Sequence, residues 1–181
     1  MSSTDQIDES VRFIPVRIAI ATISDTRQLA DDISGDTLAA RVTEAGHVLV
    51  ARAVLLDEVS DIVAHLDAWI SAHDIDVIIT TGGTGVTGRD VTPEAFKRVI
   101  DKEIEGFGEL FRAISYNKIG TSTMQSRALG GVADGTYLFE LPGSTGAVKD
   151  GWDEILKFQL DSRHKPCNLV ELMPRLNEHL K

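Results

Sequence analysis

One glycine-rich segment near the middle of the chain has the clearest potential for chemistry. It reads Thr81-Gly82-Gly83-Thr84-Gly85-Val86-Thr87-Gly88-Arg89-Asp90. Glycine has no Cβ, so this backbone can turn sharply and approach a ligand closely. Its N–H groups, with the start of the following helix, favour an anion, and Arg89 adds a fixed positive charge. We predict an anion-binding loop that is neither a Walker loop nor a dinucleotide motif; a flexible connector is the alternative.

Two acidic residues follow neighbouring predicted strands. Asp57 comes directly after the second strand, and Asp90 closes the glycine-rich loop after the third. Ligands of open α/β sheets bind at the carboxyl ends of the strands, so these two carboxylates could converge on Mg²⁺ and help to align two phosphates. Asp57 could instead be an acid at a helix N-terminus, with Glu58 in its place as the ligand. Asp90 could be a loop or capping residue.

Hydrophobic patterning predicts the elements that must position these residues. Apolar residues recur on one face over 58–73, which indicates an amphipathic helix. The run 75–80 is apolar without alternation, as in a strand buried on both faces. Further strands are predicted over 17–23, 47–56 and 135–141, and further helices over 34–45, from Thr92, over 107–115 and over 144–160. This alternation predicts an α/β fold, three-layered, with a mostly parallel central sheet and helices on both faces.

Composition restricts the function further. The formal net charge of −10 argues against nucleic-acid binding, which needs a basic face, so any phosphate must be held by local donors. No apolar run reaches membrane-spanning length, and a single cysteine, Cys167, fits a reducing cytoplasm. We expect a disordered polar tail over 1–12, without the features of a secretory signal, and one domain over 13–181.

Several motifs match a known family in order along the chain. Thr80 to Gly85, followed by Arg89-Asp90-Val91-Thr92-Pro93-Glu94-Ala95, resembles the signature of the MoaB/MogA family of molybdenum cofactor biosynthesis proteins. The matches cover most of the chain from about Ile18 onward, and downstream they resemble the MoaB branch more than the MogA branch. The downstream matches are Gly106–Glu109, Ile119–Ala128, Leu141–Thr145, Gln159–Arg163 and Lys165–Asn168.

This resemblance implies a molybdopterin-binding, MogA-like fold and a molybdopterin adenylyltransferase. Such proteins join AMP from ATP to the terminal phosphate of molybdopterin, with Mg²⁺, and release pyrophosphate. They form homo-oligomers, either trimers or, in the MoaB branch, hexamers. By motif position, the family's two catalytic aspartates, which would hold the metal, fall on Asp57 and Asp90. The implied substrate-binding residues are Ser24, Ser122, Arg127, Gly143, Ser144 and Thr145, together with the glycine-rich loop.

Ordinary structural roles remain open for several of these residues. Ser24 could be a simple turn residue, the turn around Gly143 could be a helix cap, and Arg127 could be a subunit-interface charge. Two other functions also compete with the transferase. One is a molybdopterin-binding or assembly protein of the MoaB branch without turnover, and the other is a nucleotide hydrolase of the CinA type on the same fold.

Overall fold

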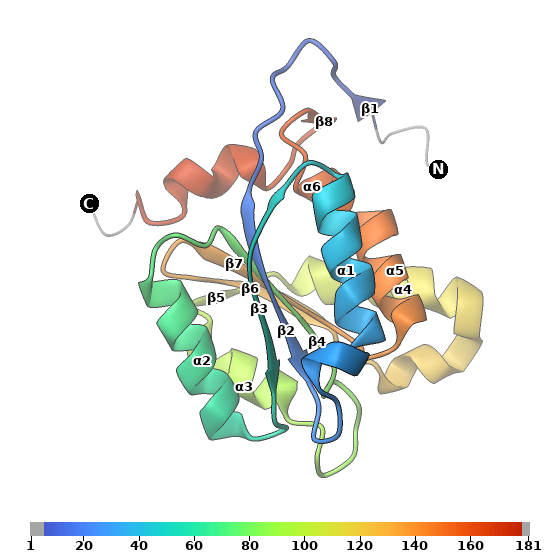
Figure 1. Cartoon of the computed structure of the whole chain (residues 1–181). Helices are drawn as coiled ribbons and strands as arrows, with labels where there is room; N and C mark the ends of the chain where they lie inside the picture. Colours follow the sequence, from blue (N-terminus) through green and yellow to red (C-terminus); the bar gives the residue numbers. More distant parts are fainter. Residues whose placement is uncertain (1–5, 179–181) are drawn as a thin grey trace.

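A computed structural model describes residues 6–178 of the chain. Its centre is a six-stranded sheet in the order β3-β2-β4-β7-β6-β5 (Figure 1). The strands are β2 (Arg17–Ile23), β3 (Val48–Leu55), β4 (Val77–Thr81), β5 (Lys102–Glu103), β6 (Leu129–Ala133) and β7 (Thr136–Leu141). The pairings among β3, β2, β4 and β7 are parallel, and those of β6 with β7 and with β5 are antiparallel. The predicted mostly parallel sheet is confirmed.

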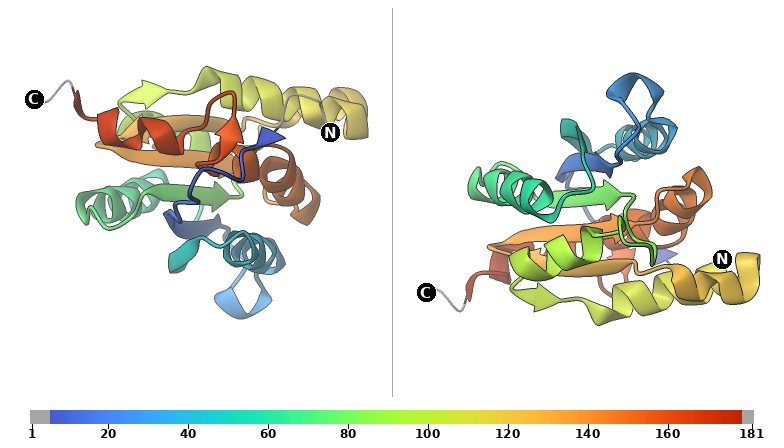
Figure 2. Two further views of the ribbon diagram at one scale, coloured as in Figure 1. Left: turned by 90° about the horizontal axis from the view of Figure 1, so that it is seen from above. Right: turned by 90° about the horizontal axis from the view of Figure 1, so that it is seen from below.

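Helices cover both faces of the sheet, as the two views along it show (Figure 2). One face carries α1 (Ile33–Glu44), α4 (Glu105–Ile119) and α5 (Thr145–Gly151), and the other carries α2 (Val59–Ser71) and α3 (Thr92–Val99). Successive side chains of a strand point to opposite faces. Ile18 and Ile20 of β2 therefore pack in the same cluster as Leu38 of α1, whereas Ala19 packs in the cluster of Ile62 of α2. Burial on both faces explains the uninterrupted apolar runs in the sequence.

Short helical segments connect the main elements. They are η1 (Leu29–Asp31), η2 (Gly120–Gln125), η3 (Trp152–Leu156), α6 (Lys157–Gln159) and η4 (Val170–Arg175). The helix expected over 144–160 is continuous from Thr145 to Gln159, and its middle part, η3, is a π-helical turn between α5 and α6. The helix expected over 107–115 is longer than predicted and runs on into η2. Because of this greater length, α4 and η2 together form one wall of a cleft at the carboxyl ends of the central strands.

The hairpin of β6 and β7 was not anticipated from the sequence. Asp134 and Gly135 connect the two strands, with φ of 42° and 83°. Positive φ at both central residues is typical of the two-residue hairpin turn that Asp-Gly favours. This dipeptide was the available signal for the hairpin. Gly130 and Gly131 weaken the strand pattern of β6, since a side chain at Gly130 would lie 2.9 Å from the ring of Phe139.

The N-terminal segment pairs with a segment near the other end of the chain. β1 (Gln6–Ile7) lies antiparallel to β8 (His164–Lys165) (Figure 1). The amide of Asp8 also donates to the carbonyl of Arg163 at 2.9 Å. The disordered tail predicted over 1–12 therefore does not extend to Gln6 and the residues that follow it, because main-chain pairing holds them. The first five residues of that prediction lie outside the described part of the chain.

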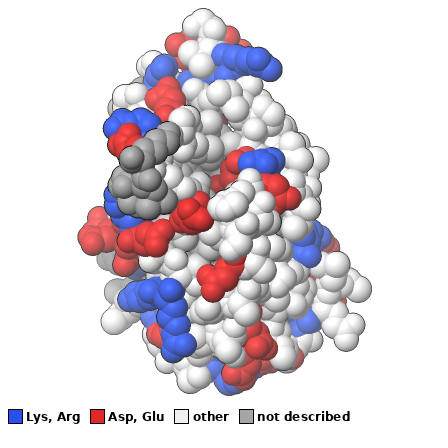
Figure 3. Space-filling model, turned by 90° about the vertical axis from the view of Figure 1, so that its left-hand side faces the viewer, with Lys and Arg blue, Asp and Glu red and all other residues white. Residues whose placement is uncertain are grey.

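Surface charge and the length and apolar character of the helices are relevant to whether the chain could bind nucleic acid or cross a membrane. On the side that lies to the left in Figure 1, basic side chains form separate groups among acidic and uncharged ones (Figure 3). Within residues 6–178, no helix combines the length and the apolar character that crossing a membrane requires.

Candidate active site

A cleft of about 570 Å³ opens where β2, β4 and β7 end. Three of its walls are the segments that follow these strands, and the fourth is formed by α4 and η2. Most of the predicted site residues line this cleft: Ser24, Asp57, Gly82, Gly83, Thr84, Gly85, Arg89, Asp90, Ser122, Gly143 and Ser144. Thr81, Arg127 and Thr145 do not line it. The structure therefore brings together residues that lie far apart in the sequence.

The first two glycines of the loop are required by close backbone approach. Gly82 has φ of +108°, and a Cβ there would lie 2.2 Å from the carbonyl oxygen of Ile23. Gly83 has φ of +65°, and its Cβ would lie 2.2 Å from Oγ1 of Thr92 and 2.8 Å from Oδ1 of Asp57. Both conformations also disfavour any side chain. The loop backbone is thus pressed between the end of β2 and the start of α3.

Two threonines hold the ends of this loop in place. Thr81 is buried, and its hydroxyl donates to the carbonyl of Pro142 at 3.0 Å, which ties the end of β4 to the turn after β7. Oγ1 of Thr92 donates to the carbonyl of Gly82 at 2.9 Å. Thr81, predicted as a substrate-binding residue, therefore supports the cleft from behind.

Arg127 forms hydrogen bonds with the loop from the side away from the cleft. Its Nε donates to the carbonyl of Gly85 and its Nη2 to the carbonyl of Asp90, each at 2.7 Å, and its Nη1 pairs with Glu94. It lines a separate hollow with Val86 and Glu94. The resemblance implied a substrate-binding arginine, but in this structure the guanidinium is occupied by loop carbonyls and one carboxylate.

Arg89 is also engaged by the protein itself. Its Nε and Nη2 donate to the two oxygens of Asp25 at 2.9 and 2.8 Å, and its Nη1 donates to Glu58 at 2.8 Å. These hydrogen bonds raise the pKa of Arg89 and lower that of Asp25. Two carboxylates on one guanidinium leave no free positive charge. The charge of Arg89, which was expected to bind a phosphate, is therefore neutralised. Glu58, the alternative to Asp57, pairs with Arg89 and does not line the cleft.

The two candidate catalytic acids line the same cleft in different environments. Burial, followed by the negative charge of Asp25, raises the pKa of the Asp57 carboxyl, and Asp90 contributes in the same direction. Burial also raises the pKa of Asp90, but hydrogen bonds from the hydroxyl and amide of Thr87, at 2.6 and 2.9 Å, outweigh it and leave the pKa below its ordinary value. Burial and the neighbouring carboxylates therefore disfavour the charged form of Asp57, whereas the hydrogen bonds from Thr87 favour that of Asp90.

The carboxylates of Asp57 and Asp90 suit a cation that needs few protein ligands. Within residues 6–178, no group of three or more acidic, histidine or cysteine side chains is arranged to hold a metal ion. Mg²⁺ usually takes one or two carboxylates and fills its remaining positions with water and substrate phosphates. Asp57 and Asp90 are hard oxygen donors, and the raised pKa of Asp57 is what a nearby cation would reverse. These two residues fit Mg²⁺ that is shared with a phosphorylated ligand.

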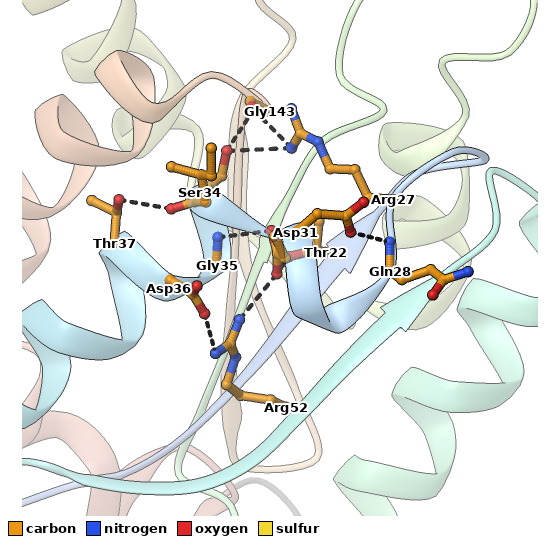
Figure 4. Close-up of polar contacts among 12 residues, drawn as sticks. Thr22, Arg27, Gln28, Asp31, Ser34, Gly35, Asp36, Thr37, Arg52 and Gly143 are labelled. Atoms are coloured by element: carbon orange, nitrogen blue, oxygen red, sulfur yellow. Dashed lines mark hydrogen bonds and ion pairs between the residues drawn. The ribbon is translucent and has the colours of Figure 1, made fainter.

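The segment after β2 contributes the predicted Ser24 and two residues that the sequence did not single out, Arg27 and Ser34. Oγ of Ser24 accepts hydrogen bonds from the amides of Thr26 and Arg27 at 3.3 and 3.2 Å, so this serine shapes the turn. Arg27 lines the cleft and donates from Nη1 to the carbonyl of Gly143 at 3.3 Å. Ser34 donates to the same carbonyl at 2.8 Å, and both side chains reach it in Figure 4.

A buried network fixes the start of α1 beside this turn. Asp32 is 1% exposed and caps the helix by accepting from the amide of Gly35 at 2.9 Å. Its other oxygen accepts from the hydroxyl of Thr22 at 2.6 Å and from Arg52 at 3.1 Å. A buried carboxylate needs such partners. The network therefore orients Ser34, and through it the turn at Gly143, from within the core.

The fourth wall was missed because it depends on packing between distant segments. α4 and η2 contribute Phe111, Ser115, Ile119 and Gln125 to the cleft, besides the predicted Ser122, and Ser126 follows directly after η2. Helical periodicity places Phe111 on a buried face, but it does not tell which loops that face meets. Ser144, an implied substrate-binding residue, caps α5, since its hydroxyl oxygen accepts from the amide of Ala147 at 3.2 Å, which agrees with the alternative given for the turn around Gly143.

Comparison with known proteins agrees with this geometry. The family model described as "Probable molybdopterin binding domain" matches residues 19–162. The chain is 48% identical over 159 residues to molybdenum cofactor biosynthesis protein B of Escherichia coli (strain K12), which covers 88% of this chain and 94% of the relative.

Solved structures give the same result. A crystal structure of molybdenum cofactor biosynthesis protein B superposes with a TM-score of 0.82 at 40% identity, covering 91% of this chain and 98% of the other. The tungsten cofactor synthesizing protein MoaB from Pyrococcus furiosus gives a TM-score of 0.70 at 35% identity, with 78% and 90% of the two chains covered.

Proposed function

The chain belongs to the MoaB/MogA family of molybdenum cofactor biosynthesis proteins, and on this premise we propose that it binds molybdopterin and ATP in the cleft and joins AMP to the terminal phosphate of the pterin. The coarser function, molybdenum cofactor biosynthesis, follows from family membership. The proposal of adenylyl transfer depends on one observation above all. Asp57 and Asp90 line one cleft together with the main chain of the glycine-rich loop.

The reaction needs alignment more than proton transfer. An oxygen of the terminal phosphate attacks the α-phosphorus of ATP, the bond from that phosphorus to the bridging oxygen breaks, and pyrophosphate leaves with the electron pair. The attacking oxygen is already anionic, so no base is required. The obstacle is repulsion between anions, which close positioning and charge neutralisation reduce.

The chain's own residues supply that positioning in this proposal. The main chain at Gly83 and Gly85 lines the cleft and would lie next to the incoming phosphates, and the hydrogen bonds of Arg127 and Thr92 keep this backbone in place. Asp57 and Asp90 would hold Mg²⁺, which when bound supplies positive charge for the phosphate oxygens. The lowered pKa of Asp90 keeps its carboxyl ionised for that role.

The test is direct detection of the product. The full chain is mixed with ATP, Mg²⁺ and molybdopterin, and adenylylated molybdopterin and pyrophosphate are measured by chromatography. We expect both products in equal amounts and neither after chelation of Mg²⁺. Bound molybdopterin without product at saturating ATP would contradict the transferase.

One observation favours a binding or assembly protein as the second candidate. The side chain of Asp90 is turned toward Thr87, and Arg89 is fully paired with carboxylates, so neither is held ready for a phosphate. Tight molybdopterin binding without turnover would support that function. The names of the relatives are those of cofactor biosynthesis proteins, which favours both candidates over a CinA-type hydrolase.

We also propose a homo-oligomer, a trimer or a hexamer, working in the cytoplasm. The support is an apolar surface along α4 and η2, where Tyr116, Ile119 and Met124 are 56%, 54% and 80% exposed. Exposed apolar patches commonly mark protein interfaces. The single cysteine agrees with a reducing compartment. The mass in solution, measured by light scattering, tests the oligomer, and a monomer would refute it.

A further inference from the structure

The charges lining the cleft leave one arginine unneutralised. Four ionisable side chains line it, namely Arg27, Asp57, Arg89 and Asp90. Arg89 is bound by Asp25 and Glu58, so its charge is more than offset. Among residues 6–178, no carboxylate lies within ion-pairing distance of Arg27. It is therefore the one cation of this cleft whose charge is available to a ligand.

The guanidinium of Arg27 also has hydrogen-bond donors that the described residues do not use. Only Nη1 is engaged, and its two acceptors, the carbonyl of Gly143 and Oγ of Ser34, are neutral and lie at 3.3 Å. Nε and Nη2 have no hydrogen-bond partner in the described part of the chain. Their N–H groups form one edge of the planar fork, and such an edge matches two oxygens of a phosphate.

The position of Arg27 is set by structure on both sides of it. The hydroxyl of Ser24 organises the turn that presents Arg27, and Ser34 anchors the turn after β7 that Arg27 touches. Ser34 in turn lies two residues after Asp32, which is buried and hydrogen-bonded to Thr22. An arginine held at one nitrogen loses less conformational entropy when its other nitrogens bind a ligand.

We propose that Arg27 binds a phosphate group of the substrate through Nε and Nη2. The net charge of −10 repels anions, so binding depends on local donors, and Arg27 provides the positive charge that Arg89 and Arg127 do not. This inference rests on the proposed function for the identity of the ligand. The phosphate belongs either to the pterin or to ATP, and the chemistry of recognition is the same for both.

The test compares ligands with and without phosphate. Dissociation constants are measured by calorimetry for 6-hydroxymethylpterin, its phosphate monoester, ATP and inorganic pyrophosphate, with the full chain and with Arg27→Gln. We expect Arg27→Gln to weaken binding of at least one phosphorylated ligand about 10- to 100-fold, as for loss of a charge-assisted hydrogen-bonded pair, and to leave 6-hydroxymethylpterin unchanged. Arg27→Lys should restore binding only in part, because lysine has no fork.

Arg98→Gln is the matched control. Arg98 is exposed on α3, outside the cleft, and the same net charge is lost. We expect wild-type affinities from this variant. Equal weakening by both variants would reduce the effect to overall charge and overturn the inference.

The remaining outcomes separate this inference from the proposed function. Arg27-dependent binding of the pterin phosphate alone, or of ATP alone, supports the inference and identifies which substrate supplies the phosphate. Arg27-dependent pyrophosphate binding without any pterin binding supports the Arg27 site and refutes the proposed function. Binding of all four probes that is independent of Arg27, or no binding of any phosphorylated probe, overturns the inference.

Discussion

Arg127 donates from Nε to the carbonyl oxygen of Gly85 at 2.7 Å, across 42 positions of sequence. The same side chain reaches the carbonyl of Asp90 from Nη2, also at 2.7 Å, and its amide donates to the carbonyl of Thr84 at 3.2 Å. One residue therefore holds both ends of the segment that carries Asp90. The charge that the family motif assigns to substrate is used to shape the loop.

Replacement of Arg127 tests this relationship. In Arg127→Lys the ammonium cannot reach both carbonyls, so we expect kcat for adenylyl transfer to fall about 10- to 100-fold, with KM nearly unchanged. The free energy of unfolding should fall by about 1–3 kcal/mol, because partly buried acceptors lose their donors. Glu94→Gln is the control, since it removes only the partly exposed ion pair and should change stability by less than about 1 kcal/mol. Equal effects of the two variants would contradict the positioning role.

Gly83 and Gly88 provide a matched pair within the loop. Gly83→Ala places a Cβ 2.2 Å from Oγ1 of Thr92 at φ of +65°, so we expect a loss of at least about 1 kcal/mol in the free energy of unfolding, and displacement of Asp57. A Cβ at Gly88 would meet no atom within 4 Å, and φ there is not positive, so Gly88→Ala should be neutral or slightly stabilising. Denaturant unfolding of both variants measures these changes in stability. Similar losses of stability in the two variants would contradict the close backbone approach at Gly83.

Asp90→Asn tests the proposed chemistry. The amide keeps one oxygen for the hydrogen bonds from Thr87, so we expect the fold and the binding of molybdopterin to persist while product formation is abolished. Thermal unfolding, pterin titration and the product assay are compared. Asp67→Asn, an exposed acid on α2, is the control and should retain activity. Loss of pterin binding together with activity would give Asp90 a different role.

Glu140 provides a prediction about pH. It is 0% exposed on β7, opposite Thr80 of β4, and within residues 6–178 neither its carboxylate oxygens nor the Thr80 hydroxyl has a hydrogen-bond partner. Burial raises the pKa of this carboxyl well above its ordinary value, although Arg127 and Lys97 lower it and Glu94 and Glu103 raise it.

The sign of that shift fixes the expected result. A raised pKa in the folded state contributes stability that is complete below the unfolded pKa and is lost as pH rises through the folded pKa. Glu140→Gln should therefore gain stability relative to the wild type as pH is raised from about 5 to about 8, as measured by denaturant midpoints. Glu103→Gln, at an exposed position of β5, should show no such trend. A constant difference between wild type and Glu140→Gln across this range would refute the assignment.

Local patterns were sufficient for much of the fold and for one side of the site. Helical periodicity predicted α2, the apolar run predicted β4, and glycine chemistry identified the loop at Gly82 and Gly83, because each depends on residues that are near neighbours in sequence. The motif order identified the family, and the confirmed mostly parallel sheet follows from alternating elements. The Asp134-Gly135 turn was also local, and the hairpin could have been predicted from it.

Only the tertiary structure decided how these parts use one another. Three features join segments that are separated by many residues. They are the wall formed by Phe111 and η2, the ion pair of Arg89 with Asp25, and the hydrogen bond from Arg127 to Gly85. No local pattern encodes which carboxylate a side chain will meet, since that depends on packing of the whole sheet and its helices. The sequence by itself indicated Asp57, Arg89 and Asp90 as charged groups of the site. The fold decided that Arg89 and Arg127 are occupied by the protein and that Arg27 remains available.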